Sequence, residues 1–307
     1  MKKISVITPI YNESQNILEC CDSVRNFFHN KKEYDYEHIL VDNCSIDDGL
    51  EKVKKILKED KKIKLIINAK NYGIMPSLFN ALKFTSGDGV LTCYSCDMQD
   101  PIEFLEKFIK KWEEGYDVVY AIRKKRNENY LLTFIKLIYY ELYSFLSDGV
   151  KTENFVSLFQ FIDKSILEKL ISFKTSYPHI ASMISSVSSN SVGVETTWVK
   201  RKKGLSKNNF FALAKEALIA LIQFTTFLPT ISFLALIFFI FVSFSLLLLR
   251  VFTNMGHDLF LTLLLIEIVF IFVILFMLIF FLSIKIYYLT KDIRKDNVVL
   301  VKETYNL

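Results

Sequence analysis

Three carboxylates stand directly after short hydrophobic runs that are rich in β-branched residues. Asp42 follows one run, and Asp97 and Asp100 follow another. A nucleotide diphosphate needs a divalent cation or arginines to neutralise it, and Mg²⁺ or Mn²⁺ takes one or two carboxylates plus phosphate oxygens. Asp97 and Gln99 alternate in an extended segment and can offer two oxygen ligands, with the Ser95 hydroxyl as a third. This pattern predicts a Mg²⁺ or Mn²⁺ site for a phosphorylated ligand.

The same aspartates also have a purely structural interpretation. Asp100 precedes Pro101, and an acidic residue followed by proline is typical of the start of a helix. A helix opening near Pro101 accounts for Asp100 at least as well as a catalytic role does, so the sequence leaves both open.

The elements that must position these residues are alternating strands and helices. Strand-helix-strand repetition predicts an α/β domain with a mostly parallel sheet, whose ligands bind at the carboxyl ends of the strands. Chemistry is therefore expected in residues 9–13, 42–45, 68–73 and 95–101. The predicted strands are 4–8, 37–42, 64–67, 90–94 and 118–121, and the predicted helices are 15–28, 48–57, 76–84 and 102–112.

The last third of the chain is strongly apolar. Residues 228–249 carry no charge, and residues 259–284 carry only Glu267. Each stretch exceeds the roughly 20 residues that cross a hydrocarbon core, so we predict two transmembrane helices. Glu267 is costly in hydrocarbon unless it is protonated, paired or near an end. It could face a helix neighbour or a partner subunit, or a tilt of the span could bring it to the interface.

The charges beside these spans predict their orientation. Lysine and arginine are concentrated in 200–215 and 285–295, whereas the connection between the spans carries one firm positive charge, Arg250. By the positive-inside rule, both flanks and both termini are cytosolic. The N-terminal stretch is interrupted by Pro9 and does not form a signal peptide. We therefore expect a multi-pass protein of the inner (cytoplasmic) membrane.

Two amphipathic segments are predicted, one within the catalytic domain and one directly before the first span. Residues 134–146 and 210–224 carry apolar side chains at helical spacing, and both suit a place at the membrane interface. Packing against the sheet or against another subunit is the alternative. Two-span anchors need neighbours to bury polar groups such as Glu267, so we expect a homo-oligomer.

Composition argues against other classes of protein. The net charge of +5 is concentrated beside the spans, which suits anionic lipid headgroups, and no nucleic-acid partner is expected. The five cysteines lie in the predicted cytosolic part, where thiols stay reduced. Cys93 and Cys96 form a C-x-x-C without a second ligand pair, so we interpret them as structural cysteines rather than a zinc or redox site.

Taken together, these segments resemble glycosyltransferase family 2, and within it the polyprenyl-phosphate glycosyltransferases. The resemblance covers nearly the whole chain. It is carried by Val6-Ile7-Thr8-Pro9-Ile10-Tyr11-Asn12-Glu13, Val41-Asp42-Asn43-Cys44-Ser45-Ile46-Asp47, Asn71-Tyr72-Gly73, Gly87-Asp88 and Cys96-Asp97-Met98-Gln99-Asp100-Pro101, and later by Gly115-Tyr116-Asp117-Val118-Val119 with Arg123 and Arg126, by 159–164, by 201–207 and by 285–287.

The resemblance implies a role for each matching residue. The nucleotide sugar is expected at Pro9, Tyr11, Asn12, Glu13, Asp42, Asn43, Ser45, Asn71, Gly73 and Asp97. The divalent cation is expected at Asp97 and Gln99, with Ser95 as the third candidate. The acceptor phosphate is expected at Arg123 and Arg126, which with Asp97 are the predicted catalytic residues, and at Arg201, Ser206 and Lys207. These last three are equally consistent with a basic patch that binds anionic lipid.

The implied reaction is inverting transfer of a hexose from a UDP-sugar to undecaprenyl phosphate, for cell-envelope glycan biosynthesis. A phosphate monoester is already ionised at cytosolic pH, so the reaction requires no general base. Catalysis then reduces to positioning and to neutralising the leaving diphosphate. A glycosyltransferase with a non-lipid glycan acceptor and a non-catalytic nucleotide-sugar-binding scaffold remain as alternatives.

The sequence departs from the family pattern at four places. Asn43 stands where the family has a second aspartate, and Ser95 removes one charge from the expected metal site. Ile102 replaces a proline, and Gln160 replaces the usual arginine. An amide can still hydrogen-bond a base edge, so we expect altered nucleotide contacts at Asn43 rather than lost binding.

We expect four parts in the chain. Residues 1–205 form the cytosolic glycosyltransferase domain and 206–226 a juxtamembrane amphipathic helix. Residues 227–285 form the two-helix anchor, and 286–307 form a cytosolic tail.

Overall fold

The computed structural model describes residues 1–123, 138, 141, 156–175, 178–201, 203, 227–252, 257–294 and 299–307. The described chain divides into two units. One unit holds the mixed sheet and its helices, including the C-terminal residues 299–307. The other holds two long apolar helices. The expected amphipathic segments 134–146 and 210–224 lie largely or wholly outside the described residues.

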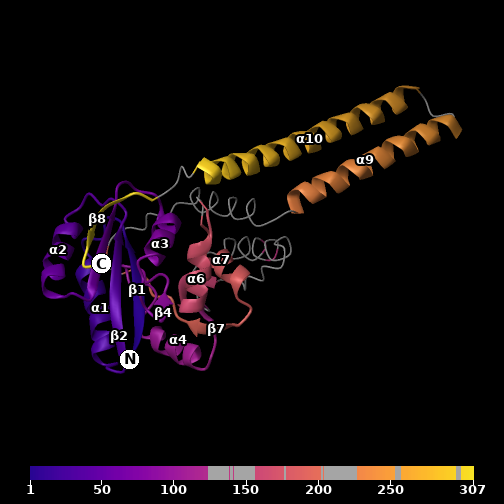
Figure 1. Ribbon diagram of the computed structural model, residues 1–307. Coiled ribbons are helices and arrows are strands. Elements are labelled where there is room, and N and C mark those ends of the chain that lie inside the picture. The colour runs from indigo at the N-terminus through magenta and orange to yellow at the C-terminus, as the bar shows by residue number, and fades with distance from the viewer. Residues whose placement is uncertain are drawn as a thin grey trace. The chain divides into compact units, whose positions relative to one another are not determined.

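The first unit is built on an eight-stranded sheet with the order β7-β5-β6-β4-β1-β2-β3-β8 (Figure 1). The inner strands β4, β1, β2 and β3 are parallel, as predicted. Pairs β3–β8, β4–β6 and β5–β6 are antiparallel, whereas β7 runs parallel to β5. The strands are β1 (Lys2–Ile10), β2 (Tyr34–Asp42), β3 (Ile63–Asn68), β4 (Gly89–Leu91), β5 (Val118–Arg123), β6 (Val156–Asp163), β7 (Ser191–Thr196) and β8 (Val301–Tyr305).

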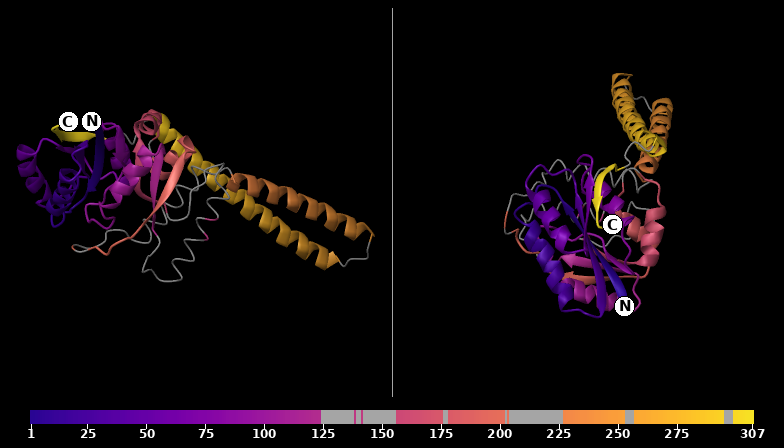
Figure 2. Two further views of the ribbon diagram at one scale, coloured as in Figure 1. Left: turned by 90° about the horizontal axis from the view of Figure 1, so that it is seen from below. Right: turned by 60° about the vertical axis from the view of Figure 1, so that its left-hand side comes forward.

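Helices cover both faces of this sheet (Figures 1 and 2). The helices of this unit are α1 (Ile17–His29), α2 (Gly49–Glu59), α3 (Ile74–Leu82), α4 (Phe104–Glu113), α6 (Lys164–Ser172) and α7 (Ile180–Val187). Buried side chains of α1, α2 and α4 share one core with Ile4, Leu40 and Leu65 from the sheet. Burial of these inner strands on both faces explains their short continuous hydrophobic runs, such as 39–41 in β2 and 65–67 in β3.

The predicted strands and helices overlap these elements, although most bounds differ by up to three residues. One of these differences concerns the site. β4 ends at Leu91 rather than at Tyr94. Beyond Leu91 the chain still bonds to both neighbours, through Thr92 N to Gln160 O at 2.8 Å and Tyr94 N to Ile7 O at 2.7 Å. These bonds do not form a regular ladder, so the C-x-x-C residues follow the strand instead of ending it.

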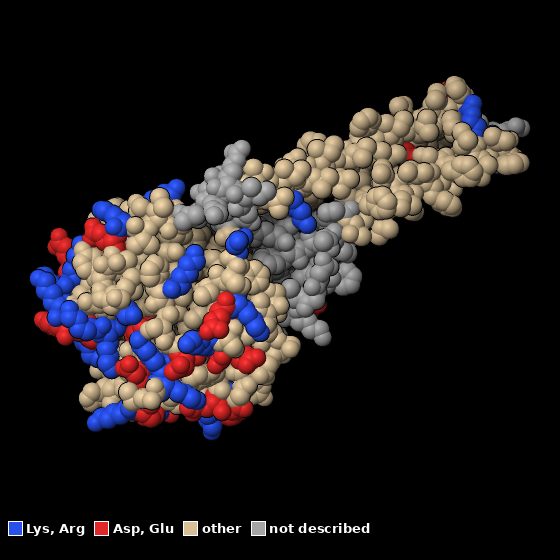
Figure 3. All heavy atoms as spheres, viewed as in Figure 1, with Lys and Arg blue, Asp and Glu red and all other residues tan. Residues whose placement is uncertain are grey.

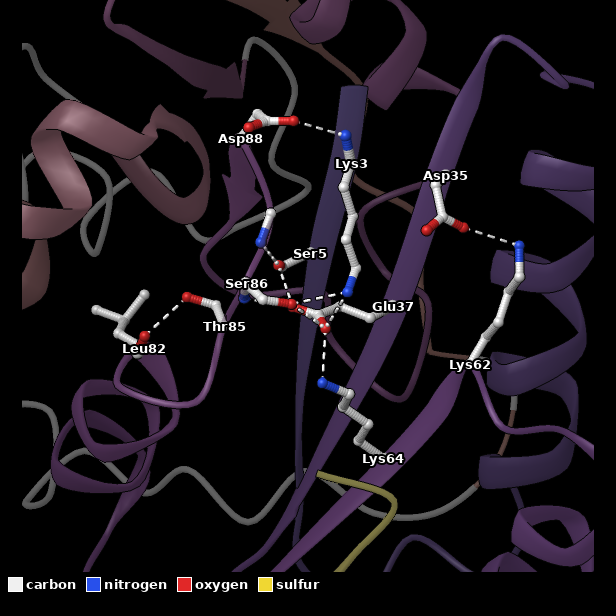
Figure 4. A network of polar contacts seen from close by, with 11 residues as sticks. Lys3, Ser5, Asp35, Glu37, Lys62, Lys64, Leu82, Thr85, Ser86 and Asp88 are labelled. Carbon is white, nitrogen blue, oxygen red and sulfur yellow. Dashed lines mark hydrogen bonds and ion pairs between the residues drawn. The ribbon is translucent and has the colours of Figure 1, made fainter. Parts of the chain in front are cut away.

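A buried ionic cluster joins the first three strands and the segment after α3 (Figure 4). Glu37 on β2 is 1% exposed. Its carboxylate lies 2.7 Å from Lys64 Nζ and 3.0 Å from Lys3 Nζ, and it accepts hydrogen bonds from Ser5 Oγ and from Ser86 N and Oγ. Burial opposes ionisation, but these bonds outweigh it and lower the pKa of Glu37 to about 2.

The second unit consists of α9 (Phe227–Phe252) and α10 (His257–Arg294). Their segments Thr230–Phe252 and His257–Lys291 are long and apolar enough to cross a membrane. Charged side chains are dense over the first unit and sparse over this one (Figure 3). Phe239 stacks on Phe270 at 5.7 Å. Ser243 Oγ donates a 2.6 Å hydrogen bond to Glu267, so the charged residue of the second span faces the neighbouring helix.

Candidate active site

The loops after β1 and β2 bind each other at the carboxyl edge of the sheet. Asn12 N donates to Ser45 Oγ at 2.9 Å, and Ile46 N donates to Asn12 Oδ1 at 2.8 Å. Asn43 N donates to the carbonyl of Ile10 at 2.9 Å. Reciprocal bonds of this kind fix the predicted nucleotide residues Asn12 and Ser45 against each other.

Unusual backbone conformations occur in these loops. Asn12, Cys44 and Met98 have φ values of 53°, 65° and 54°. Residues with side chains rarely adopt positive φ, and such conformations cluster at ligand sites, where the surrounding structure holds them in place. All three follow strands at the edge where the sequence predicts the ligand.

Asp42 presents an unpaired acceptor at this edge. Its Oδ2 accepts the backbone N–H of Ser45 at 3.0 Å. Its Oδ1 is buried and has no hydrogen-bond partner among the described residues. Burial raises the pKa of Asp42. A buried acceptor without a donor is costly, so this carboxylate is suited to receive an N–H or O–H from a ligand.

The side chain of Asn43 is hydrogen-bonded to the loop that follows β3. Its Oδ1 accepts from Tyr72 N and Ser77 Oγ, each at 3.0 Å, and from Asn68 Nδ2 at 3.3 Å. Its Nδ2 donates to Asn71 Oδ1 at 2.8 Å. An aspartate at this position could not make the last bond, because a carboxylate has no donor at neutral pH. The asparagine therefore orients Asn71.

Arg201 lies across the expected donor site. Its Nη2 is 2.7 Å from Glu13 Oε1 and 2.5 Å from Oε2, and its Nη1 is 3.5 Å from Asp97 Oδ2. Val199 N donates to the carbonyl of Gln99 at 2.9 Å. The segment before the membrane helices thus contacts both the β1 loop and the Asp97 loop, and its guanidinium neutralises two predicted site carboxylates.

The expected metal ligands supply hard oxygens but few charges. Asp97 is half-buried, and burial raises its pKa. Gln99 N donates to Asp97 Oδ1 at 3.4 Å, and Ser95 lies in the same turn, where its carbonyl accepts from Met98 N at 2.9 Å. Within the described ranges, no group of three or more His, Cys, Asp or Glu side chains is placed to hold a metal ion. One carboxylate with neutral oxygens fits a cation that receives its remaining ligands from phosphate.

Arg123 is held by Asp100. Nε and Nη2 of Arg123 lie 3.0 Å and 2.5 Å from the two oxygens of Asp100, whose side chain is 3% exposed. A two-point pair of this kind fixes the plane of the guanidinium. Asp100 therefore has a definite role at the end of β5. Its expected role at the start of a helix is wrong, because α4 begins at Phe104 with Glu103 at the N-cap.

The two cysteines of the C-x-x-C lie directly before the Asp97 loop. Cys93 and Cys96 are free and buried. Burial is the main cause that raises the pKa of Cys93. Buried, protonated thiols are neither good nucleophiles nor good metal ligands, which agrees with the structural interpretation of the C-x-x-C.

The structure brings most of the predicted site residues to one edge of the sheet. Pro9 lies in β1, one residue before its end. Tyr11, Glu13 and Gly73 belong to the same loops as the residues above, and Gly73, with φ of 88°, caps α3. Arg126, Ser206 and Lys207 lie outside the described residues. Sequence reasoning missed Asn16, whose Nδ2 donates to Glu13 Oε2 at 2.7 Å, and Ser77, whose Oγ donates to Asn43 Oδ1. Both lie inside the predicted helices 15–28 and 76–84, where no local pattern marks them. Asn68 was expected only as the first residue of the range 68–73.

The fold and these motifs match one protein family. The model of the family described as Glycosyl transferase family 2 matches residues 5–171. The chain belongs to glycosyltransferase family 2. The match to this glycosyltransferase includes the loops after β1, β2 and β3 and the segment 95–101, which hold many of the predicted site residues.

Several relatives of this glycosyltransferase are known by sequence. The bactoprenol glucosyl transferase of Shigella phage SfX is 29% identical over 226 residues, which cover 73% of each chain. A prophage bactoprenol glucosyl transferase homologue of Escherichia coli (strain K12) is 27% identical, again over 73% of each chain. CsbB of Bacillus subtilis (strain 168) is 26% identical, and the match covers 72% of this chain but only 66% of CsbB.

Solved structures share the fold at low sequence identity. Mannosyl-3-phosphoglycerate synthase from Rubrobacter xylanophilus has a TM-score of 0.50 and 14% identity, with 72% of each chain covered. This likeness shows the α/β fold with a mostly parallel sheet that the sequence predicts.

Proposed function

We propose that this glycosyltransferase moves a hexose from a UDP-sugar to a polyprenyl phosphate, in particular undecaprenyl phosphate, at the cytosolic face of a membrane. The observation that carries the proposal is the joining of one donor-type site to two membrane-length apolar helices in a single chain. Relatives named bactoprenol glucosyl transferases support the class of acceptor.

The donor is proposed to lie along the carboxyl edge of the inner strands. Asp42 Oδ1 accepts no hydrogen bond in the part of the chain that the structure describes. An N–H of the nucleotide base would supply the missing donor. Tyr11, Asn71 and Gly73 border the same edge. The diphosphate is proposed to lie toward Asp97, Gln99 and Arg201.

The residues of this chain bind and orient the substrates and neutralise the charge of the diphosphate. A bound Mg²⁺ or Mn²⁺, held by Asp97 and Gln99, would supply positive charge to the leaving diphosphate. One guanidinium cannot bind both Glu13 and a phosphate fully. Arg201 is therefore placed to release Glu13 and bind phosphate oxygens instead. The acceptor is an ionised phosphate that attacks the anomeric carbon without a protein base, so positioning and charge stabilisation provide the catalysis.

The sheet itself supports the proposed membrane topology. β7 precedes the apolar helix pair and β8 follows it, yet both belong to one sheet. If α9 and α10 each cross the bilayer, the chain must return to the side from which it left. Two crossings with both flanks on the cytosolic side satisfy this condition and agree with the concentration of basic residues there.

The test is transfer of labelled sugar. Membranes that contain the protein are incubated with labelled UDP-hexoses, GDP-mannose and undecaprenyl phosphate, and the organic phase is counted. We expect a chloroform-soluble product that depends on both the protein and the lipid phosphate. Absence of such a product across the whole donor panel, or a label that enters only water-soluble glycan, would sink the proposal.

A further inference from the structure

The last strand of the chain lies at the sheet edge beside the donor side. β8 pairs antiparallel with β3, with Leu65 opposite Tyr305 and Ile67 opposite Glu303. The register shifts between Ile67 and Asn68, where Val301 is the partner. β8 therefore follows β3 up to the residue from which the donor-side loop departs (Figure 1).

Leu300, just before β8, bonds to both ends of this loop. Ala69 N donates to the carbonyl of Leu300 at 2.8 Å, and Leu300 N donates to the phenolic oxygen of Tyr72 at 3.3 Å. Leu300 thus bonds to both ends of the segment 69–72 from the edge of the sheet.

Asn43 holds the same loop from the inside. It accepts from Tyr72 N at 3.0 Å and donates to Asn71 at 2.8 Å. The loop has the exposed Asn71 and Gly73 at its far end. An exposed segment with so few contacts keeps one shape only if such bonds restrict it, and a preformed shape lowers the entropy lost when a ligand binds.

We propose that Leu300 and β8 are a positioning element for the nucleotide, so that the tail beyond the apolar helices contributes to donor affinity. The inference rests on the donor site of the proposed function. Leu300 itself acts through Ala69 and Tyr72, and it sets the place of Asn71 at the carboxyl edge.

The other end of β8 provides a matched control. Asn306 Nδ2 donates to the carbonyls of Leu57 and Ile63 at 3.1 and 3.0 Å. These bonds anchor the tail near the start of β3, at the opposite end of the strand from the loop. Asn306→Ala therefore removes bonds at the far end of β8, while the pairing of β8 with β3 and the bonds of Leu300 to 69–72 remain.

The experiment compares Leu300→Pro, Tyr72→Phe, the double variant and Asn306→Ala in the full chain. Leu300→Pro removes the N–H, and Tyr72→Phe removes only the hydroxyl, so it keeps the test valid if the proline variant fails to fold. We expect donor KM to rise about three- to tenfold for each single variant, with kcat within about twofold. Both substitutions break the same hydrogen bond. Donor KM in the double variant should therefore rise by less than the product of the two single-variant increases. Asn306→Ala should leave donor KM unchanged.

Hydrogen exchange separates this inference from the proposed function. The peptide that covers 68–73 should exchange about tenfold faster in Leu300→Pro than in the unaltered protein, with no substrate present. Unchanged exchange, or a donor KM that rises as much in Asn306→Ala as in Leu300→Pro, overturns the positioning role. Failure of the unaltered protein to transfer sugar to the lipid phosphate would instead overturn the proposed function, and the exchange result would still stand.

Discussion

Arg201 lies with its guanidinium against the carboxylate of Glu13, at 2.7 Å from Oε1 and 2.5 Å from Oε2. The two residues are 188 positions apart in the sequence. Both side chains are largely buried, with 16% and 12% exposed. A charge pair shielded from water in this way interacts more strongly than a surface pair, so the segment that leads to α9 is firmly attached to the loop after β1.

Arg201→Gln is expected to lower turnover about 100-fold. The substitution removes a cation from the leaving diphosphate, and loss of one preorganised donor commonly costs this much. Glu13 and Asp97 also lose their counter-charge. Initial rates over a range of donor concentrations measure the effect. Arg25→Gln, which removes an exposed arginine paired with Asp22 and Asp60, serves as control and should keep the rate within twofold.

Asp97→Asn is expected to raise the concentration of Mn²⁺ or Mg²⁺ needed for half-maximal rate at least tenfold. Asp97 is the single carboxylate of the predicted ligand set, and an amide oxygen binds a hard cation more weakly than a carboxylate does. Metal titration after treatment with EDTA measures this value. Full activity of the unaltered protein in excess EDTA would contradict both the prediction and the proposed cation.

Arg123→Ala is expected to destabilise the catalytic domain by about 3 kcal/mol, because it leaves the buried Asp100 carboxylate without its partner. Thermal unfolding followed by Trp112 fluorescence would record the loss. An unstable variant loses activity whether or not Arg123 binds the acceptor. The acceptor role therefore needs a separate measurement. Arg123→Ala combined with Asp100→Asn should regain most of the stability, and transfer to polyprenyl phosphate should stay abolished. Recovery of transfer would show that Arg123 only supports the fold.

Glu37 is expected to make the catalytic domain sensitive to acid. Its folded pKa of about 2 lies below the ordinary 4.5, so the unfolded chain binds the proton more readily. The stabilisation, on the order of 3 kcal/mol, is complete above about pH 4.5 and is lost as the pH falls toward 2. Melting temperatures between pH 6 and 3 test this expectation. Glu37→Gln should start from a lower stability and show a flatter decline, and an equally steep decline would refute the assignment.

Much of this architecture was predictable because the inner strands have strong local signals. β1, β2 and β3 are hydrophobic runs that end in Ile10, Asp42 and Asn68, and a parallel sheet places those ends together. The predicted positions of Asp42 and of the Asn12–Ser45 loops follow from that geometry alone.

The contacts that complete the site could not be predicted in this way. β8 has the polar sequence Val-Lys-Glu-Thr-Tyr and forms a strand only because β3 offers an open edge. The Arg201–Glu13 pair and the Leu300 bonds join residues that are distant in sequence, and no local pattern marks such partners. Asp100 shows the same limit, since its partner Arg123 lies on β5, 23 positions further along the chain.

The position of β8 after both apolar helices sets an order of assembly. Its partner β3 leaves the ribosome early, whereas β8 is synthesised only after α9 and α10. Domains form as their segments emerge during synthesis, so most of the catalytic sheet can fold while the edge beside β3 stays open. The loop at 69–72 receives its bonds to Leu300 only after both apolar helices have been made. A nascent chain that has not yet made its membrane helices therefore still lacks one strand of its catalytic sheet.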